Sequence, residues 1–543
     1  MPAPRHDEAV LQQTLEAYRD AGGDQTEAAR TLGIPRSTFL SRLARAKKLG
    51  VDLKKLEAGG QVEAMRTKVN RLPKRGQVKR YICTSAQNNT KVWHGFENLK
   101  ALADHYGAEI LVGTFSYKKS SYGKASVKRG AKTGGATSDE TWYDPAIVPF
   151  IRDERVQLAP GLVWCGEQNI LPTATDPLTG FETYNGRQSG IFPHARIEMR
   201  SVPSAKFEGT KLNYSTGTIT QRNYIQKRAG LRAEFAHCYG GLLVEVCPDG
   251  TWFVRQLHAG EDDSVYDLDL RVQAGEVTAG NRVEALSWGD VHTDMLEDEQ
   301  RDLAWGKGGI MDLLRPRHQF LHDVLDFRSR NHWDLKNPHR MFEKHVQGRE
   351  SVRDEVARVR ALLLETAARP DCETVVVSSN HDMALERWLC SSDYRSDPLN
   401  AEFFLELQLE KYRAMRRGDE QFYTFERAIA MVGGAPEVRF LHEDESYVIC
   451  HDDLGGIECG IHGDNGPNGS RSTPHNLSRL GRATSVGHTH SAGIFGRLYV
   501  AGVMGNLDMK YNKGPSSWTH SHIVTYPNGR RAIVTTFGGR FRA

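Results

Sequence analysis

The most constraining feature of this sequence is a series of five polar clusters within residues 281–543. Each cluster directly follows a short apolar run, and the series extends from Asp290 and His292 to His488 and His490. Short apolar runs separated by helical stretches predict strands that alternate with helices. Polar residues at the carboxyl ends of such strands gather at one edge of a sheet. The C-terminal half therefore predicts a layered α/β domain with a polar crevice.

The side chains in these clusters are of the kinds that hold hard divalent metal ions. Aspartate, asparagine and histidine recur, while cysteine is nearly absent, which argues against structural zinc and favours manganese, iron or a similar ion. Two such ions about 3.5–4 Å apart can acidify a bridging water and clamp phosphoryl oxygens. The mixture of donors therefore indicates a two-metal phosphoesterase. The alternative is a metal-free α/β domain with incidental histidines and aspartates.

The ordered motifs resemble those of the calcineurin-like metallophosphoesterase superfamily, which are D-x-H, G-D-x-x-D, G-N-H-D/E, G-H and G-H-x-H. The resemblance implies a β-sandwich flanked by helices over residues 281–543. It also implies that His381 protonates the leaving oxygen and that Asp382 orients the His381 ring. The metal ligands that it implies are Asp290, His292 and His490 for one ion, Asn380, His462 and His488 for the other, and Asp323 as the bridge between them.

The sequence departs from the superfamily pattern beside two of these ligands. His322 precedes Asp323, and Ser379 precedes Asn380, where glycine is usual in both places. Neither departure replaces a ligand, so the ligand assignment stands and only the local turn is in question. In the fourth motif His451 competes with His462. We prefer His462 because it follows an apolar segment and precedes a glycine-rich loop.

The first 50 residues predict three short helices, over 7–21, 24–32 and 35–48, with a turn at Gly33 before the third. This segment resembles the Fis-type DNA-binding helix-turn-helix, whose A-A-x-x-L-G-I-x-R-x-T pattern runs from Ala28. The alternative is a three-helix module for packing or oligomerisation. The candidate DNA contacts are Arg36, Ser37, Thr38, Arg42 and Arg45.

Charge is distributed unevenly along the chain. Residues 1–80 hold 17 Lys and Arg against 9 Asp and Glu, a local charge of +8, so the net charge of +3 leaves −5 for the remainder. A basic arm on a nearly neutral body suits a polyanionic partner. The alternative is a basic face exposed to solvent that binds nothing.

Between the two ends the sequence indicates connecting and middle segments. Residues 51–76 predict a linker, and 77–280 predict a middle α/β domain of unassigned role. That domain starts with a β-α-β pattern over 77–115, and residues 116–140 follow as a basic, glycine- and serine-rich loop. The dipeptide Asp249-Gly250 predicts a hairpin.

Three features favour DNA among phosphoester substrates. They are the helix-turn-helix, the basic N-terminal arm, and Arg328 and Arg330, which follow the bridging aspartate. Within the superfamily the motifs look most like the SbcD-type repair nucleases, and the arrangement of segments looks like the pre-early nucleases with which some tailed phages degrade host DNA. We therefore interpret the chain as a phage-encoded DNA nuclease that uses two divalent ions, manganese first, with magnesium or iron as alternatives.

Two other functions remain open. One is a phosphomonoesterase or cyclic-nucleotide phosphodiesterase with a regulatory helix-turn-helix. The other is a DNA-binding regulator with an inert phosphoesterase fold. The 8 cysteines are scattered and no apolar run reaches about 20 residues, so we expect a cytoplasmic protein, in the host cell if phage-encoded, without a membrane partner. The sequence leaves a homo-oligomer open.

Overall fold

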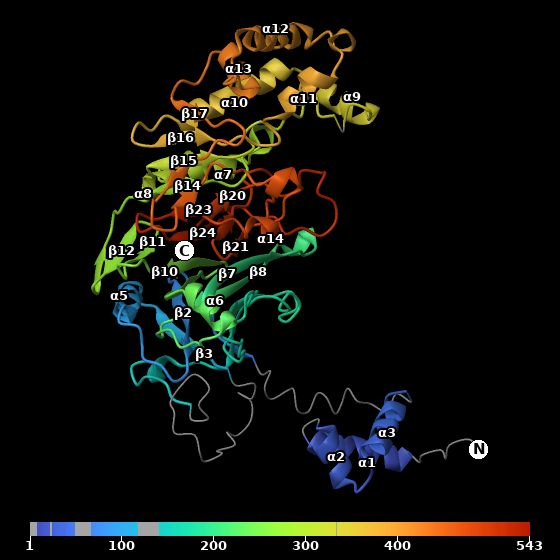
Figure 1. The fold of residues 1–543 in the computed structure, drawn as a ribbon, viewed down its shortest axis with the longest axis vertical. Helices are drawn as coiled ribbons and strands as arrows, with labels where there is room; N and C mark the ends of the chain where they lie inside the picture. Colours follow the sequence, from blue (N-terminus) through green and yellow to red (C-terminus); the bar gives the residue numbers. More distant parts are fainter. Residues whose placement is uncertain (1–7, 22–23, 49–66, 118–140, 333) are drawn as a thin grey trace, which may run out of the picture. The chain divides into compact units, whose positions relative to one another are not determined.

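The structure is a computed structural model, and it describes residues 8–21, 24–48, 67–117, 141–332 and 334–543 (Figure 1). The chain divides into two compact units, Met1–Val69 and Asn70–Ala543. We describe each unit by itself. The predicted linker falls mostly outside the described residues, as does most of the predicted basic loop.

The N-terminal unit contains three helices where the sequence predicts them, α1 (Glu8–Asp20), α2 (Gln25–Thr31) and α3 (Arg36–Lys48), followed by β1 (Lys68–Val69). The carboxylate of Asp24 caps α2 by accepting hydrogen bonds from two backbone amides. The turn before α3 places Gly33 at φ 63°, a conformation that glycine adopts without steric cost. The buried core of the three helices consists of Leu11, Leu15, Ala17, Ala28, Ala29, Phe39, Leu43 and Ala46.

A six-stranded sheet forms the centre of the C-terminal half, in the order β17-β16-β15-β14-β23-β24. The four strands β14 to β17 pair in parallel, and β23 and β24 extend the sheet antiparallel. Their bounds are β14 (Ala285–Ser287), β15 (His318–Leu321), β16 (Glu373–Val376), β17 (Val438–Phe440), β23 (Ser521–Thr525) and β24 (Arg531–Thr535).

Helices cover one face of this sheet through a single apolar core that includes Leu286, Leu321 and Val376 from the strands. The local sequence explains where two helices of this half begin. Asn337 caps α9 ahead of Pro338, and Ser351 caps α10, whose valines and leucines recur at helical spacing. The helices that contribute to this core are α7 (Asp298–Trp305), α8 (Ile310–Leu314), α10 (Val352–Thr366), α11 (Ala384–Ser391), α12 (Ala401–Arg417) and α13 (Thr424–Met431), and α9 (Pro338–Val346) belongs to the same half of the chain without contributing to it.

A larger sheet lies against the other face. Ala285, Phe320 and Val375 of the six-stranded sheet pack on Ile457 and Ala483 of the larger one, so the two sheets form a sandwich. The larger sheet contains, in order, β4 (Arg155–Ala159), β5 (Leu162–Cys165), β6 (Ser189–Phe192), β8 (Lys211–Gly217), β7 (His194–Val202), β21 (Gly493–Phe495), β22 (Leu498–Val500), β20 (Ala483–Val486), β19 (Ile457–Glu458) and β18 (Val448–Ile449).

The middle segment adds a four-stranded sheet in the order β10-β9-β2-β3. The predicted β-α-β unit is present, because β2 (Lys79–Gln87) and β3 (Glu109–Phe115) pair in parallel across α5 (Phe96–Tyr106). The predicted hairpin joins β9 (Gly240–Val246) to β10 (Trp252–His258). The remaining elements are α6 (Arg228–Phe235), β11 (Val265–Asp267), β12 (Leu270–Gln273), β13 (Glu276–Thr278) and α14 (Pro474–Leu477).

The predicted boundary at residue 280 does not separate two compact units. Strand β7 of the middle segment pairs antiparallel with β21 of the C-terminal half, with Arg200 opposite Gly493. The two segments therefore share one sheet within the unit Asn70–Ala543. The fold is mixed α/β with several sheets. Among the described residues, each helix is too short or too polar to cross a membrane.

Candidate metal centre

Five strands deliver the predicted site residues to one place in the fold. Asp290 follows β14, and Asp323 follows β15. Asn380 follows β16 in the same sheet, while His462 and the pair His488 and His490 follow β19 and β20 in the larger sheet. The sandwich thus brings together residues that lie up to 200 positions apart in the sequence.

The first group of donors is fully buried. Asp290 Oδ2 lies 3.0 Å from His490 Nε2, and His490 Nε2 lies 3.0 Å from His292 Nε2. With Asp323, these residues place one donor atom each within 4.8 Å of one another. Carboxylates and imidazoles at this spacing form the usual ligand set of a divalent metal. These buried groups can therefore hold a metal ion.

A second group lies beside the first. Asn380 Oδ1 is 3.1 Å from His462 Nε2 and 3.1 Å from His488 Nδ1. Asp323 Oδ2 is 3.3 Å from His462 Nε2 and 3.9 Å from His292 Nε2. Asp323 therefore lies between the two groups, and all seven predicted ligands are gathered in one cluster.

The backbone is strained at four of these seven residues. His292, Asp323, His488 and His490 have φ of 49°, 46°, 72° and 57°. A residue other than glycine is destabilised by about 1–3 kcal/mol in such a backbone conformation. The conformation persists where the surrounding structure enforces it, and it is frequent at functional sites. Gly487 is required for a different reason. A Cβ there would lie 2.2 Å from Asp290 Oδ1.

Asp326 is a part of the site to which the sequence analysis gave no role. Its carboxyl is buried, and Oδ1 lies 2.8 Å from His292 Nδ1. Burial raises the pKa of Asp326, but His292 lowers it more, so the carboxyl is ionised and accepts the Nδ1 proton. Burial lowers the pKa of His292, but Asp326 and Asp323 raise it to about 9. When the ring is neutral, its proton on Nδ1 leaves the lone pair on Nε2, toward the other donors. This arrangement of carboxylate, histidine and metal position is common around bound metals.

The electrostatics of the cluster follow from close packing of opposite charges. Burial raises the pKa of Asp290, but His462 and His490 lower it more, to about 2. Burial lowers the pKa of His462, but Asp323 and Asp290 raise it to about 10. The carboxylates thus draw a proton onto His462, whereas burial holds the pKa of His490 below its usual value. A bound cation would satisfy the same carboxylates and release the proton of His462.

His381 lies at the rim of the cluster. Its ring packs edge-on against the His292 ring with centroids 4.9 Å apart, and Nδ1 lies 3.2 Å from the carbonyl oxygen of Asp326. The predicted orienting role of Asp382 is wrong. The buried Asp382 carboxylate accepts hydrogen bonds from the Leu325 amide and the Ser379 hydroxyl instead, so the Asp326 carbonyl positions the His381 ring.

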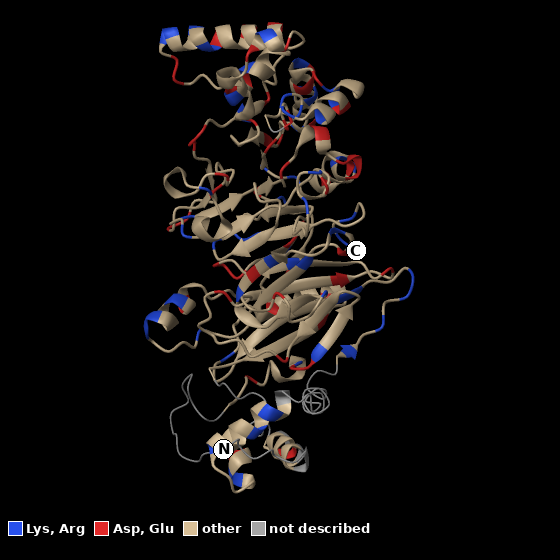
Figure 2. Ribbon diagram, turned by 90° about the vertical axis from the view of Figure 1, so that its right-hand side faces the viewer, with Lys and Arg blue, Asp and Glu red and all other residues tan. Residues whose placement is uncertain are grey.

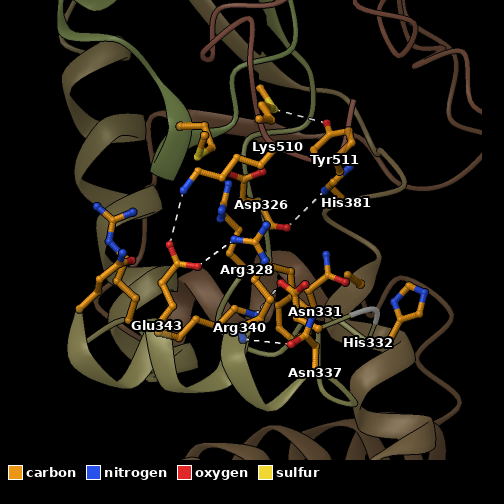
Figure 3. A pocket seen from close by; sticks show the side chains of 18 of the residues that line it. Asp326, Arg328, Asn331, His332, Asn337, Arg340, Glu343, His381, Lys510 and Tyr511 are labelled. Carbon is orange, nitrogen blue, oxygen red and sulfur yellow. Dashed lines mark hydrogen bonds and ion pairs between the residues drawn. The ribbon is translucent and has the colours of Figure 1, made fainter. Parts of the chain in front are cut away.

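A pocket of about 950 Å³ opens beside His381 and Asn380 (Figure 3). Segments after β15, along α9 and after residue 508 line it. Seven Lys or Arg residues line it against three Asp or Glu, and we call it the basic pocket. The cations are Arg328, Arg340, Lys344, Arg349, Arg387, Lys510 and Lys513, and the acids are Asp326, Asp334 and Glu343.

The two predicted arginines after Asp323 have different surroundings. Arg328 lines the basic pocket, and among the described residues its guanidinium has no ion-pair partner. The prediction that Arg330 contacts DNA is wrong. Arg330 is buried, and its guanidinium donates to both carboxylate oxygens of Asp397, at 2.6 and 2.7 Å. A paired, buried arginine fixes the chain locally and is not free to meet a phosphate.

A second pocket, of about 740 Å³, adjoins the same cluster at Asn380 and His462. Arg387 is the Lys or Arg residue on its wall, and it also lines the basic pocket. We call this second cavity the acidic pocket. Its carboxylates are Glu443, Asp444, Glu445, Glu458 and Asp464.

One exposed aromatic residue stands beside the cluster. Tyr511 lines the basic pocket with 57% of its surface exposed. Its ring meets the edge of Trp518, and Trp518 in turn packs edge-on against His490, with centroids 4.3 Å apart. The sequence analysis did not identify Tyr511, because no motif marks it.

The predicted DNA contacts of the N-terminal unit lie on α3. Arg36 and Ser37 are exposed, and Thr38, Arg42 and Arg45 are half-buried. Arg36 donates to Gln25 Oε1 of α2 at 3.3 Å, which links the two helices. The first turn of α3 therefore presents polar side chains to solvent, as a recognition helix does.

Comparisons with known proteins bear on both units. The family described as the PucR C-terminal helix-turn-helix domain matches residues 11–63, which identifies a helix-turn-helix and suggests DNA as a partner. Protein A1 of Escherichia phage T5 is 39% identical over 480 residues, covering 86% of this chain and 83% of that protein. No solved structure matches the chain.

Proposed function

The chain belongs to the family of Protein A1 of Escherichia phage T5, and from this premise we propose that it is a phage-encoded, metal-dependent DNA nuclease of the metallophosphoesterase superfamily. The observation that carries the proposal is the convergence of seven predicted ligands beside the basic pocket. In this proposal the protein acts in the host cytoplasm, and its role is to degrade host DNA.

The residues fit two divalent ions. Asp290, His292 and His490 would hold one ion, and the proton that Asp326 fixes on His292 Nδ1 leaves Nε2 free to coordinate. Asn380, His462 and His488 would hold the other, because their donor atoms already meet at 3.1 Å. Asp323 would bridge them. Oxygen and nitrogen donors without sulfur favour manganese, with magnesium or iron as alternatives.

Two such ions would supply an acidified water and neutralise charge on the phosphoryl oxygens. The chain's own contribution is to place the phosphodiester and to handle the proton of the leaving group. His381 stands between the cluster and the basic pocket, and its Nε2 has no partner among the described residues. We assign His381 the donation of a proton to the leaving oxygen.

The charge of the basic pocket supports a polyanionic substrate. A single phosphate needs few cations, whereas a DNA strand presents a phosphate at every nucleotide. Arg328, Lys510 and Lys513 enter this pocket from two separate segments, which suits contacts to successive phosphates. Tyr511 offers a flat, exposed ring on which a nucleobase can stack. The helix-turn-helix adds a second contact to DNA.

The test is to incubate the full-length protein with plasmid and with linear DNA, in manganese, in magnesium and with EDTA. We expect loss of DNA in manganese and protection by EDTA. A p-nitrophenyl phosphate assay runs in parallel. Rapid hydrolysis of that monoester with intact DNA would favour the phosphomonoesterase. Binding of DNA with neither reaction would favour the inert regulator.

A further inference from the structure

Helix α12 exposes a continuous apolar stripe. Its inner side is buried in the core of the unit through Phe403, Phe404 and Leu407. On its outer side four large apolar side chains are exposed, at 45%, 48%, 59% and 64% of their surface, and they are Leu405, Leu409, Tyr412 and Met415. Their spacing of three and four residues puts them on one stripe. Such a stripe, rimmed by charge, marks an interaction surface.

This surface is separate from the candidate metal centre. In the C-terminal unit α12 lies at the outer edge of the helical layer (Figures 1 and 2). None of its residues lines the basic or the acidic pocket. Contacts to substrate at the centre therefore do not account for the stripe.

The charges along α12 are segregated by end. The first ten residues contain Glu402, Glu406 and Glu410, and the last seven contain Lys411 and three arginines. An acidic amino-terminal half and a basic carboxyl-terminal half are complementary when two copies of the helix lie antiparallel. A parallel pair would place like charges together. The helix therefore favours an antiparallel copy of itself.

The register of that pairing follows from the sequence. At 3.6 residues per turn, four exposed charges fall within about 60° on one flank of the stripe, and they are Glu402, Glu406, Arg413 and Arg417. A two-fold axis beside Leu409 sets Leu405 of one copy opposite Tyr412 of the other. The same axis sets Glu402 opposite Arg417 and Glu406 opposite Arg413. One axis thus matches the apolar and the charged residues.

The ion pairs that Glu406 and Arg413 already make do not oppose this pairing between two copies. Glu406 pairs with Arg353 at 2.7 Å, and Arg413 pairs with Glu410 at 3.0 Å, with all four side chains partly exposed. Exposed ion pairs contribute little to stability, so new partners replace them at little cost.

We propose that α12 is a dimerisation surface whose occupant is the α12 helix of a second copy of this chain, packed antiparallel about a two-fold axis. A closed two-fold interface uses the same patch on both partners, which is what the matched register provides. Two 17-residue helices bury less surface than the roughly 800 Å² per partner of a standard interface. The dimer is therefore weak, and its formation depends on protein concentration. Each dimer carries two helix-turn-helix units, which raises its avidity for long DNA.

Sedimentation of the full-length protein over a range of concentrations tests the proposal. We expect the mass to rise from that of one chain toward that of two. Leu409→Glu should keep the protein monomeric, because it sets two carboxylates face to face at the axis. Phe207→Glu is the matched control, since Phe207 is an exposed aromatic residue outside α12. That variant should dimerise like the parent.

Charge reversal identifies the partner and its direction. A Glu402→Arg/Glu406→Arg variant and an Arg413→Glu/Arg417→Glu variant should each be monomeric, because like charges then meet. An equimolar mixture of the two should form a heterodimer, because every facing pair is again opposite in sign. Hydrolysis of a small diester by each variant reports that it is folded. A parent that stays monomeric, an oligomer that Leu409→Glu leaves intact, or a mixture that fails to dimerise would overturn the proposal.

Discussion

The basic and the acidic pockets flank the same cluster and share Asn380 and Arg387, yet their charges are opposite. Seven cations line one, and five carboxylates line the other. Of the seven predicted ligands, Asn380 lines both pockets and His462 lines the acidic pocket, so the ligand cluster does not by itself say where substrate enters. The difference teaches that the segments around the sandwich set the charge on each side of the cluster. A polyanion is attracted to one side of the centre and repelled from the other.

The largest effect should come from the residue that serves both sides. Asp323 lies between the two donor groups, so Asp323→Ala should abolish hydrolysis of DNA and of small diesters alike. Bound metal should fall below that of a variant in a peripheral ligand, such as His488→Ala. Elemental analysis of parent and variants measures this. Unchanged metal content in Asp323→Ala would remove its bridging role.

The next effect should be confined to the basic side. A positioned acid contributes about 10²–10⁴-fold, so His381→Ala should cleave DNA hundreds of times more slowly while it retains metal and DNA affinity. A p-nitrophenyl diester should be affected much less, because its leaving oxygen hardly needs a proton. The ratio of rates on both substrates is the measurement. Equal slowing with metal retained would mean that His381 positions the phosphate, and loss of metal would make it a ligand.

A smaller effect should separate the two pockets directly. Replacing Arg328 and Lys513 with alanine removes two cations from the basic pocket, so the KM for DNA should rise and the slope of log affinity against log salt should fall by about 1–2. Asp444→Asn in the acidic pocket is the control. It should leave the salt slope unchanged and slightly favour DNA binding. The reverse pattern would place the DNA on the acidic side.

The smallest effect on chemistry should come from the N-terminal unit. Removing residues 1–50 should weaken DNA binding and flatten its salt dependence, while hydrolysis of a small diester continues at the parental rate. Fluorescence anisotropy at several salt concentrations measures the binding. An unchanged affinity and salt slope would mean that the basic pocket alone holds DNA, and that the helix-turn-helix serves assembly.

The sequence predicted the elements that local chemistry determines. Capping by Asp24, the turn at Gly33 and the polar residue after each apolar run were all readable along the chain. Those signals placed the three N-terminal helices and the polar clusters, and the resemblance to the metallophosphoesterase superfamily then implied the seven candidate ligands. The assignment of the helix-turn-helix to the Fis type stays a prediction, because the family that matches is of another type.

What the sequence did not predict depends on contacts between distant residues. The sequence does not show that Arg330 is paired with Asp397, because the two residues meet only in the fold. Asp382 follows His381 in the sequence, but its carboxylate accepts a hydrogen bond from Leu325. The shared sheet across residue 280 arises from pairing of β7 with β21, almost 300 residues apart. No local pattern reports such partners.

The most direct test of the central claim is anomalous diffraction from crystals grown with manganese and a short DNA strand. The account predicts two manganese peaks about 3.5–4 Å apart among the seven side chains, with Asp323 touching both. It also predicts the DNA backbone beside Arg328 and Lys513. A single peak, or none at this cluster, would contradict the two-metal centre, and DNA lying against Glu443 and Asp444 would contradict the assignment of the basic pocket.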